Sequence, residues 1–376
     1  MGIQRQLRNH LISKWDSGKV LLVTGPRQVG KTTLIHSLCE EKGNYLFLNG
    51  DDPEDRVLLE DAGEKKLRQI IGNHRILFID EAQRIKNIGI LLKIIYDRIE
   101  NVTVVVSGSS VIDLNEEINE PLTGRKWEFN LFPFSWKELN DHFGYVENHK
   151  NLPEYLIYGM YPEVITHPAE KESVLKELTK SYLYKDLLQH KGIRKPELLD
   201  KILLALALQV GSEVNYNELA GLVRADRATV EEYISLLEKT YVVFRLFPLS
   251  RNARNEISSS RKIYFYDNGV RNAIIGDFKP LEFRQDVGAL WENFVISERI
   301  KKLRYSGWPG RYYFWRTYQQ QEIDWIEEAE SKFSAFEFKW NPQKGKAKFS
   351  KTFLDNYPVE SASVITSGNL DDFLSD

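Results

Sequence analysis

The chain lacks the features of disulfide-bonded, membrane-spanning and strongly basic proteins. Its 376 residues include a single cysteine, Cys39, which cannot form an internal disulfide and favours a cytoplasmic location. No apolar run approaches the roughly 18 residues of a membrane-spanning helix, so we expect no membrane contact. The chain has 51 Lys and Arg residues and 54 Asp and Glu residues, which give a net charge of −3. Any contact with DNA must therefore come from local patches.

What the chain does contain is the composition of a globular protein with two or three domains. Hydrophobic residues make up 42% of the sequence and charged residues 28%, which argues against disorder. Near its start, Ile3, Leu7, Leu11 and Trp15 recur every four residues. This spacing predicts an amphipathic helix rather than a signal peptide.

The most informative segment is a complete phosphate-binding loop at residues 25–32, GPRQVGKT. It lies between an apolar run that predicts a strand and an amphipathic stretch that predicts a helix. Backbone amides of the loop would hold phosphate, Lys31 would reach the β- and γ-phosphates of ATP, and the Thr32 hydroxyl would bind Mg²⁺. The predicted nucleotide-binding residues are Gly25, Pro26, Arg27, Gln28, Val29, Gly30, Lys31, Thr32 and Thr33.

A second segment, residues 76–81, is an apolar strand that ends in two carboxylates, Asp80 and Glu81. In a Walker B element, Asp80 would hold Mg²⁺ through water, and Glu81 would polarise the water that attacks the γ-phosphate. An acidic turn after a buried strand is the plainer interpretation of this segment taken alone. The phosphate loop upstream favours nucleotide binding, with ATP and Mg²⁺ as the ligands.

Alternating strands and helices between residues 20 and 135 predict an α/β fold, with a parallel sheet covered on both faces. The predicted strands are 20–24, 45–49, 76–79, 102–107 and 126–130, and a helix at 88–99 is predicted before the fourth strand. Residues 152–211 are mostly helical. Short helices at 217–223 and 228–238 then precede strands at 241–247 and 262–266, which is a winged-helix pattern.

The last part of the chain carries a possible second site. A predicted helix, 286–304, is followed by strands at 312–315, 323–326 and 333–339. Asp324 lies on the middle strand, and Glu337 and Lys339 share one face of the next strand because side chains alternate. In restriction-type nucleases, two such carboxylates bind Mg²⁺ and the lysine holds the nucleophile or the phosphate. Glu292 could complete the acidic cluster, although surface charges on edge strands would give the same pattern.

Two sets of basic residues have open interpretations. They are Lys344, Lys346, Lys348 and Lys351 after the nuclease-like motif, and Arg251, Arg254 and Arg261 near the predicted wing. Each set could contact phosphates or form a solvated face. Winged helices also mediate contacts with proteins.

Together these segments resemble one family, the bacterial and archaeal predicted ATPases of the AAA+ superfamily that carry a C-terminal restriction-endonuclease-like domain of unknown function. The resemblance covers nearly the whole chain. It is carried by GPRQVGKT (25–32), FIDEAQ (78–83), SGSS (107–110), LTGR (122–125), LFPFS (131–135), YFYD (264–267), WR (315–316), EID (322–324) and EFK (337–339).

The resemblance implies a P-loop AAA+ core at 1–140, a helical lid at 141–211, a winged helix at 212–277 and an α/β restriction-endonuclease-like domain at 278–376. It places Ser107 or Ser109 where AAA+ proteins have a polar sensor of the γ-phosphate. Arg125 becomes a candidate arginine finger for a neighbouring subunit, which implies a homo-oligomer. Pairing of Arg125 with local acids is the alternative.

These features favour an ATP-hydrolysing switch or motor that acts on DNA. The alternative is an ATP-dependent regulator of a protein partner, with a catalytically inactive nuclease-like domain. A nucleotide-binding module without turnover is disfavoured by Asp80 and Glu81, because binding alone does not require a carboxylate that activates water.

Overall fold

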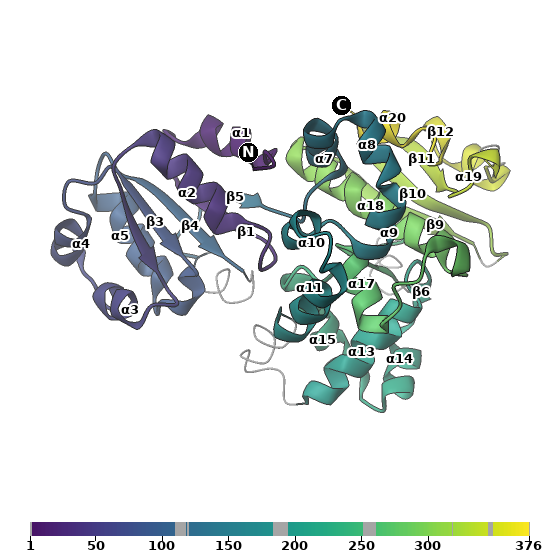
Figure 1. Cartoon of the computed structure of the whole chain (residues 1–376), viewed down its shortest axis with the longest axis horizontal. Helices are drawn as coiled ribbons and strands as arrows, with labels where there is room; N and C mark the ends of the chain where they lie inside the picture. The colour runs from purple at the N-terminus through teal and green to yellow at the C-terminus, as the bar shows by residue number, and fades with distance from the viewer. Residues whose placement is uncertain are drawn as a thin grey trace. The chain divides into compact units, whose positions relative to one another are not determined.

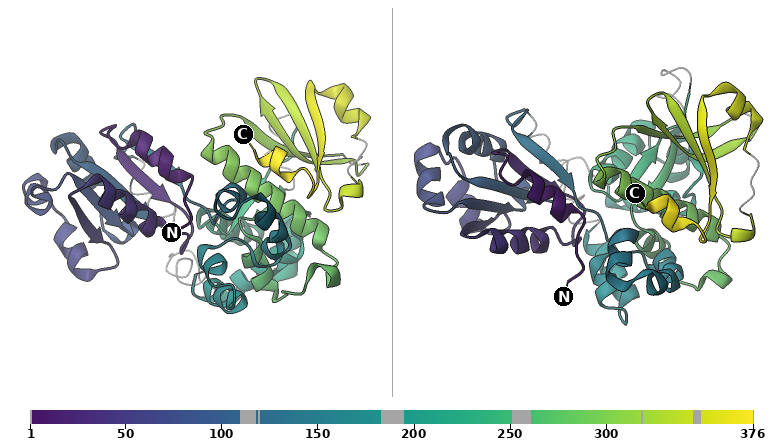
Figure 2. Two further views of the ribbon diagram at one scale, coloured as in Figure 1. Left: turned by 45° about the horizontal axis from the view of Figure 1, so that its top comes forward. Right: turned by 90° about the horizontal axis from the view of Figure 1, so that it is seen from above.

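The computed structural model forms two compact units (Figures 1 and 2). Unit 1 comprises Met1–Phe134 and Lys239–Tyr241, and unit 2 comprises Ser135–Glu238 and Val242–Asp376. The structure describes residues 2–109, 118, 120–182, 195–250, 261–317, 319–344 and 349–375. The finer division into a lid, a winged helix and a nuclease-like domain stays a prediction.

Unit 1 is built on the parallel sheet that the sequence predicts. Its five strands have the order β2-β3-β4-β1-β5, and each neighbouring pair is parallel. They are β1 (Val20–Thr24), β2 (Tyr45–Asn49), β3 (Ile76–Asp80), β4 (Thr103–Gly108) and β5 (Lys126–Asn130). Because all strands run in the same direction, their carboxyl ends meet at one edge of the sheet (Figure 1).

Helices cover both faces of this sheet. They are α1 (Leu7–Lys14), α2 (Lys31–Lys42), α3 (Pro53–Leu59), α4 (Glu64–Ile71), the short 3-10 helix η1 (Ala82–Arg84) and α5 (Ile88–Arg98). On one face, strand residues such as Leu22 and Ile79 belong to one apolar cluster with residues of α3, α4 and α5. On the other face, α2 packs against β3 and β4, where the His36 ring lies 5.2 Å from that of Phe78. The sheet is therefore buried on both sides, which explains its continuous apolar strands.

Most of the helices in the described residues belong to unit 2. They are α7 (Trp136–Phe143), α8 (Tyr145–Lys150), α9 (Leu152–Tyr158), α10 (Pro162–Thr166), α11 (Lys171–Glu177), the π-helix η2 (Leu178–Tyr182), α13 (Pro196–Leu208), α14 (Tyr216–Val223), α15 (Arg227–Lys239), α17 (Asn268–Ile275), η3 (Leu281–Phe283), α18 (Val287–Tyr305), η4 (Pro342–Lys344), α19 (Lys351–Asn356) and α20 (Leu370–Leu374). Across the parts of the chain with described structure, no helix is long and apolar enough to cross a membrane.

Two sheets complete unit 2. In the three-stranded sheet β6-β8-β7, strand β8 (Arg261–Phe265) pairs antiparallel with β6 (Glu213–Val214) and β7 (Val243–Leu246). The four-stranded sheet has the order β12-β11-β10-β9. Its strands are β9 (Arg311–Arg316), β10 (Glu322–Ala329), β11 (Lys332–Phe338) and β12 (Val359–Ile365). Helix α18 packs against β11 and also against β8, so it joins the two sheets (Figure 2).

A buried carboxylate, Asp267, links segments of unit 2 that are distant in sequence. It accepts hydrogen bonds from the backbone N–H of Met160 at 2.7 Å and of Val270 at 3.1 Å, and it caps α17. Burial raises the pKa of Asp267, although these amide donors oppose the shift. The backbone also comes very close here, because a Cβ added at Gly269 would lie 2.1 Å from the carbonyl oxygen of Tyr158.

Gly269→Ala should therefore destabilise the protein. The added methyl group would force the backbones of α9 and α17 apart, at a cost of about 1–3 kcal/mol, the range of overpacked cores. The matched control is Gly221→Ala in α14, where a Cβ would meet no atom within 4 Å. Because alanine favours a helix, this control should raise the free energy of unfolding by about 0.5–1 kcal/mol. Thermal and urea unfolding measure both, and equal effects of the two substitutions would contradict the packing assignment.

Candidate functional site

The phosphate loop joins β1 to α2 at the carboxyl edge of the unit 1 sheet. Gly25 has no room for a side chain, because an added Cβ would lie 2.0 Å from the carbonyl oxygen of Leu131. Gln28 and Gly30 have φ values of 58° and 90°, in the left-handed region. Such turns direct successive backbone N–H groups into a concave surface, which is the geometry that binds anions. Helix α2 begins at Lys31 and adds the positive end of its dipole.

The Lys31 side chain follows the loop closely. Its ammonium donates hydrogen bonds to the carbonyl oxygens of Gly25 at 2.9 Å and of Pro26 at 2.7 Å, and the residue is buried. The loop carbonyls therefore hold this cation on the loop itself. A phosphate cradled by the loop amides would lie within reach of the ammonium, in the role that the sequence predicts.

Asp80, at the end of β3, accepts hydrogen bonds from the phosphate-loop helix and from β4. The Thr32 hydroxyl donates to its Oδ2 at 2.7 Å, the Glu81 N–H donates to Oδ1 at 3.1 Å, and the Ser107 hydroxyl also donates to Oδ1. Strand β4 lies between β1 and β3, which brings Ser107 between the phosphate loop and the carboxylate. A hydroxyl and a carboxylate at this distance are the hard oxygen ligands that Mg²⁺ prefers, so the residues present fit the ion.

Glu81 adopts a strained backbone conformation. Its φ is 46°, which is uncommon for a residue with a side chain and is often found at functional sites. Its carboxylate accepts hydrogen bonds from the Ser109 hydroxyl at 3.2 Å and from the Gln83 side-chain amide. Gly50 allows the turn, because a Cβ there would lie 2.3 Å from the Glu81 carbonyl oxygen. These contacts fix the carboxylate beside Asp80.

Arg5 supports the phosphate loop, a role that the sequence did not reveal. Its guanidinium donates to the carbonyl oxygen of Val29 at 2.6 Å and to that of Phe132, and it lies 4.7 Å from the centre of the Phe134 ring. The side chain is 9% exposed. A single arginine in a predicted amphipathic helix carries no signal for this contact, because its partners lie 24 and 127 residues away.

A second unpredicted contact lies where β1 enters the loop. The hydroxyls of Thr24 and Tyr241 are 2.8 Å apart, and the Asn130 side-chain amide donates to both, at 2.9 and 2.8 Å. Tyr241 is the middle of the three residues between α15 and β7, and its φ of 60° is left-handed. Three segments of unit 1 that are far apart in sequence thus meet at the residue before the loop.

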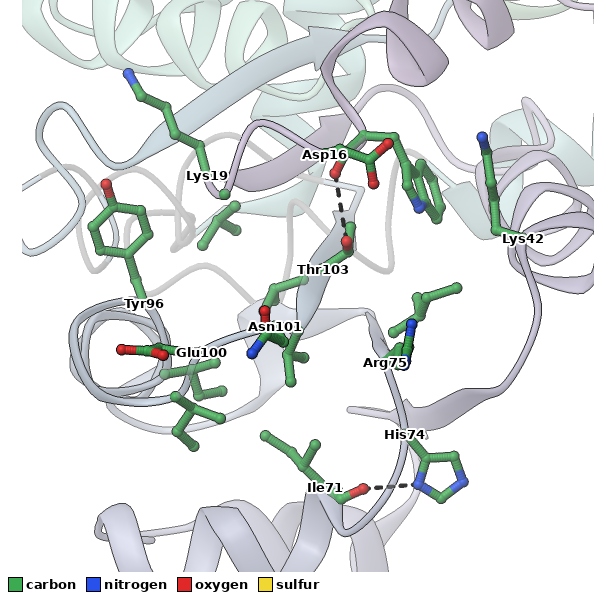
Figure 3. A pocket seen from close by; sticks show the side chains of 18 of the residues that line it. Asp16, Lys19, Lys42, Ile71, His74, Arg75, Tyr96, Glu100, Asn101 and Thr103 are labelled. Carbon is green, nitrogen blue, oxygen red and sulfur yellow. Dashed lines mark hydrogen bonds between the residues drawn. The ribbon is translucent and has the colours of Figure 1, made fainter.

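A hollow of about 1210 Å³ lies at the opposite edge of the same sheet, by the amino ends of β1, β3 and β4 (Figure 3). Its ionisable lining residues are mostly basic. They are Lys19, Lys42, Arg68, His74 and Arg75, against Asp16 and Glu100. This hollow is separate from the phosphate loop, because the two lie at opposite ends of the strands.

Arg125, the predicted arginine finger, lies at the same edge of the sheet as this hollow. It directly precedes β5, its Nε donates to Asp97 at 3.0 Å, and its guanidinium lies over the ring of Tyr96, which lines the hollow. The five residues of β5 span roughly 16 Å, so Arg125 is far from the phosphate loop of its own chain. The structure shows Arg125 paired with a local acid, which is the alternative that the sequence left open beside a role as an arginine finger.

In unit 2, the predicted acidic residues converge, as the strand pattern indicated. The Asp324 carboxylate accepts a hydrogen bond from the Phe338 N–H at 2.8 Å and lies 3.8 Å from the Lys339 ammonium. Lys339 also donates to Glu337 at 2.9 Å. Burial, followed by the charges of Glu292 and Glu337, raises the pKa of Asp324 to about 8.

A residue that the sequence analysis did not include enters this cluster. The Lys262 ammonium, from β8, lies 3.0 Å from Glu292 Oε1 and 2.5 Å from a Glu322 oxygen. The described residues contain no group of three or more His, Cys, Asp or Glu side chains that could hold a metal ion. Glu292, Asp324 and Glu337 therefore converge with lysines beside them, and the metal site predicted for them stays a prediction.

Several other candidates can be placed, and some cannot. Arg261 packs over the rings of Tyr216 and Phe247, at 5.2 and 5.4 Å from their centres. Lys351 is the exposed first residue of α19. Ser110, Arg251, Arg254, Lys346 and Lys348 lie outside the described residues, as does the Lys344 side chain.

Family models match three consecutive parts of the chain. An AAA domain matches residues 17–140, a domain of unknown function (DUF8612) matches residues 149–281, and another (DUF4143) matches residues 287–376. With the parallel sheet and the phosphate loop, the first match identifies unit 1 as an AAA-type P-loop ATPase fold.

The chain is also similar to proteins from distant organisms. An uncharacterized protein of Mycobacterium tuberculosis is 29% identical over 325 residues, which cover 85% of this chain and 70% of that protein. One of Haemophilus influenzae is 25% identical, with 78% of this chain and 77% of that protein covered. Among solved structures, a Walker-type ATPase of Pyrococcus abyssi aligns with a TM-score of 0.49 and 17% identity, over 72% of this chain and 95% of its own.

Arg5→Ala should weaken nucleotide binding. Without the guanidinium, the buried carbonyl of Val29 loses its charged donor and the loop loses a support. We expect about tenfold weaker affinity, equivalent to ~1.4 kcal/mol. The control is Arg8→Ala, which removes a more exposed pair with Glu41 and should change affinity little. Titration of a fluorescent ADP analogue measures both, and no difference between the variants would show that Arg5 does not support the loop.

Proposed function

We propose that this protein binds ATP at residues 25–33 and hydrolyses it with Mg²⁺. The observation that carries the proposal is the meeting of Thr32, Asp80 and Ser107 through hydrogen bonds at the end of three parallel strands, next to the phosphate loop. A phosphate loop alone supports binding. A loop joined to a buried carboxylate, with Glu81 beside it, also supports turnover.

Each residue has a distinct role in this proposal. The loop amides and Lys31 hold the β- and γ-phosphates, while Thr32 and Asp80 supply the oxygens that hold Mg²⁺. When bound, Mg²⁺ neutralises charge on the phosphate oxygens. Glu81 orients the attacking water, and Ser109 and Gln83 keep its carboxylate in position. Ser107 and Ser109 lie where a polar group could respond to the γ-phosphate.

The remainder of the chain would convert the nucleotide state into a contact with a partner. We propose that residues 141–211 form a helical lid, 212–277 a winged helix and 278–376 a restriction-endonuclease-like domain. The order of α14, α15, β7 and β8, with β6 paired to β8, supports the winged helix. DNA is one partner that such an arrangement would serve.

A second candidate function, regulation of a protein partner, is favoured by the charge of α15. In a DNA-binding winged helix, the second helix of the helix pair enters the major groove and carries basic or polar residues. Here α15 has Glu231, Glu232 and Glu238 against Arg227 and Lys239, so its charged residues are more acidic than basic. Such a helix would be repelled by phosphates, which supports a protein partner over DNA.

The ATPase proposal is tested with Lys31→Ala and Glu81→Gln. The first should abolish nucleotide binding or turnover, because the phosphates lose their main counter-charge. The second should retain ATP binding and stop hydrolysis, because an amide cannot polarise water as a carboxylate does. Phosphate release, measured with Mg²⁺ in the presence and absence of DNA, reports turnover. Wild-type turnover by Glu81→Gln would exclude the catalytic role of this residue.

Arg125 supports a further prediction, that the protein works as a homo-oligomer. If Arg125 reaches the phosphate loop of a neighbouring copy, Arg125→Ala should lower turnover by about 10³-fold without weakening ATP binding. Mixing Arg125→Ala and Glu81→Gln subunits should restore part of the activity, because some interfaces then contain both intact residues. Asp97→Ala is the control, since it removes the local partner and leaves the arginine. Turnover independent of protein concentration in a monomer would contradict the trans role.

A further inference from the structure

A fully buried lysine lies at the centre of the acidic cluster in unit 2. Lys262 on β8 is 1% exposed, and its ammonium contacts Glu292 and Glu322. Tyr264, two residues further along the same strand, donates its hydroxyl hydrogen to Glu292 Oε1 at 2.6 Å. Strand β8 therefore supplies both a positive charge and a hydrogen-bond donor to one carboxylate.

The charges within this cluster nearly balance. Its carboxyl groups belong to Glu292, Glu322, Asp324 and Glu337. Its cations are Lys262, Lys339 and Arg316, the last of which lies 3.7 Å from Glu322. Burial alone would lower the pKa of Lys262, but Glu292, Asp324 and Glu322 raise it above its ordinary value, so the side chain stays charged.

A divalent cation and the Lys262 ammonium would exclude each other. Both need the same carboxylate oxygens, and two positive charges this close together would repel strongly in a buried environment. Four carboxyl groups without an internal cation would need a metal ion or bound protons to offset their charge. With Lys262 in place, they do not.

We propose that Lys262 is the resident cation of this cluster and occupies the position that a catalytic metal would require. The cluster then binds no divalent metal and cleaves no DNA. Its role is to hold β8 against α18 and the β9–β12 sheet. This inference rests on the proposed nuclease-like resemblance of residues 278–376 and is independent of ATP hydrolysis.

The test measures Mn²⁺ binding to the full-length, nucleotide-free protein. Asp80→Asn serves as the background, because it removes the carboxylate of the phosphate-loop site. This background should bind no Mn²⁺ at the cluster. Adding Lys262→Met to it should create one Mn²⁺ site. Adding Asp324→Asn as well should abolish that site. Isothermal titration and the Mn²⁺ electron paramagnetic resonance signal report binding.

Three results would overturn the proposal. The first is that the Asp80→Asn background binds Mn²⁺ and loses this binding when Asp324→Asn is added. The second is that the wild type cleaves DNA and Asp324→Asn abolishes the cleavage. The third is that Lys262→Met folds but gains no Mn²⁺ site.

Thermal unfolding covers the case in which Lys262→Met does not fold. The variant with both Lys262→Met and Glu292→Gln should unfold at a higher temperature than Lys262→Met alone, because the unpaired carboxylate is gone. Simple additivity of the two substitutions would count against the pairing. Lys332→Met, which breaks an exposed pair with Glu360, is the control and should not shift the unfolding temperature.

Discussion

The candidate site of unit 1 depends on the parallel pairing of β1, β4 and β3. Thr24 pairs with Gly108, and Ile79 pairs with Val106, so the three strands end at the same level. This register brings the phosphate loop, Ser107 and Asp80 together, although each comes from a different part of the chain. The hydrogen bonds of Asp80 then hold the ends in place. If β4 were outside this position, Asp80 would lose the Ser107 hydroxyl and keep only the hydroxyl of Thr32.

Local strain is concentrated in the same region. Gln28 and Glu81 both have left-handed φ values, at 58° and 46°. Such conformations cost about 1–3 kcal/mol each and persist only when surrounding contacts determine them. Those contacts come from Arg5 near the loop and from Gln83 and Ser109 near Glu81. Burial of the sheet on both faces contributes to offsetting this cost.

The sequence predicted the parts of the molecule that are specified locally. The phosphate loop, the strand that ends in Asp80 and Glu81, and the parallel sheet each follow from a short motif or from hydrophobic periodicity. Arg5, Tyr241 and Lys262 were not predicted, because each acts through partners that only the folded chain brings near. Strand β12 was also missed, since its residues are largely exposed and lack an apolar pattern. Arg125 shows the limit of motif reasoning, because a motif names a residue but not the copy of the chain that it contacts.

Asp80 and Asp324 show how neighbours decide the chemistry of a buried carboxylate. Both are buried on strands beside other acidic residues. The donors to Asp80 are the hydroxyls of Thr32 and Ser107 and a backbone amide, all of which are neutral. They stabilise the carboxylate without cancelling its charge, so a cation is still attracted. Asp324 lies near the ammonium groups of Lys262 and Lys339, which lower its pKa, and near Glu292 and Glu337, which raise it. The two buried carboxylates therefore differ in their neighbours, because Asp80 has neutral donors and Asp324 has both cations and other carboxylates.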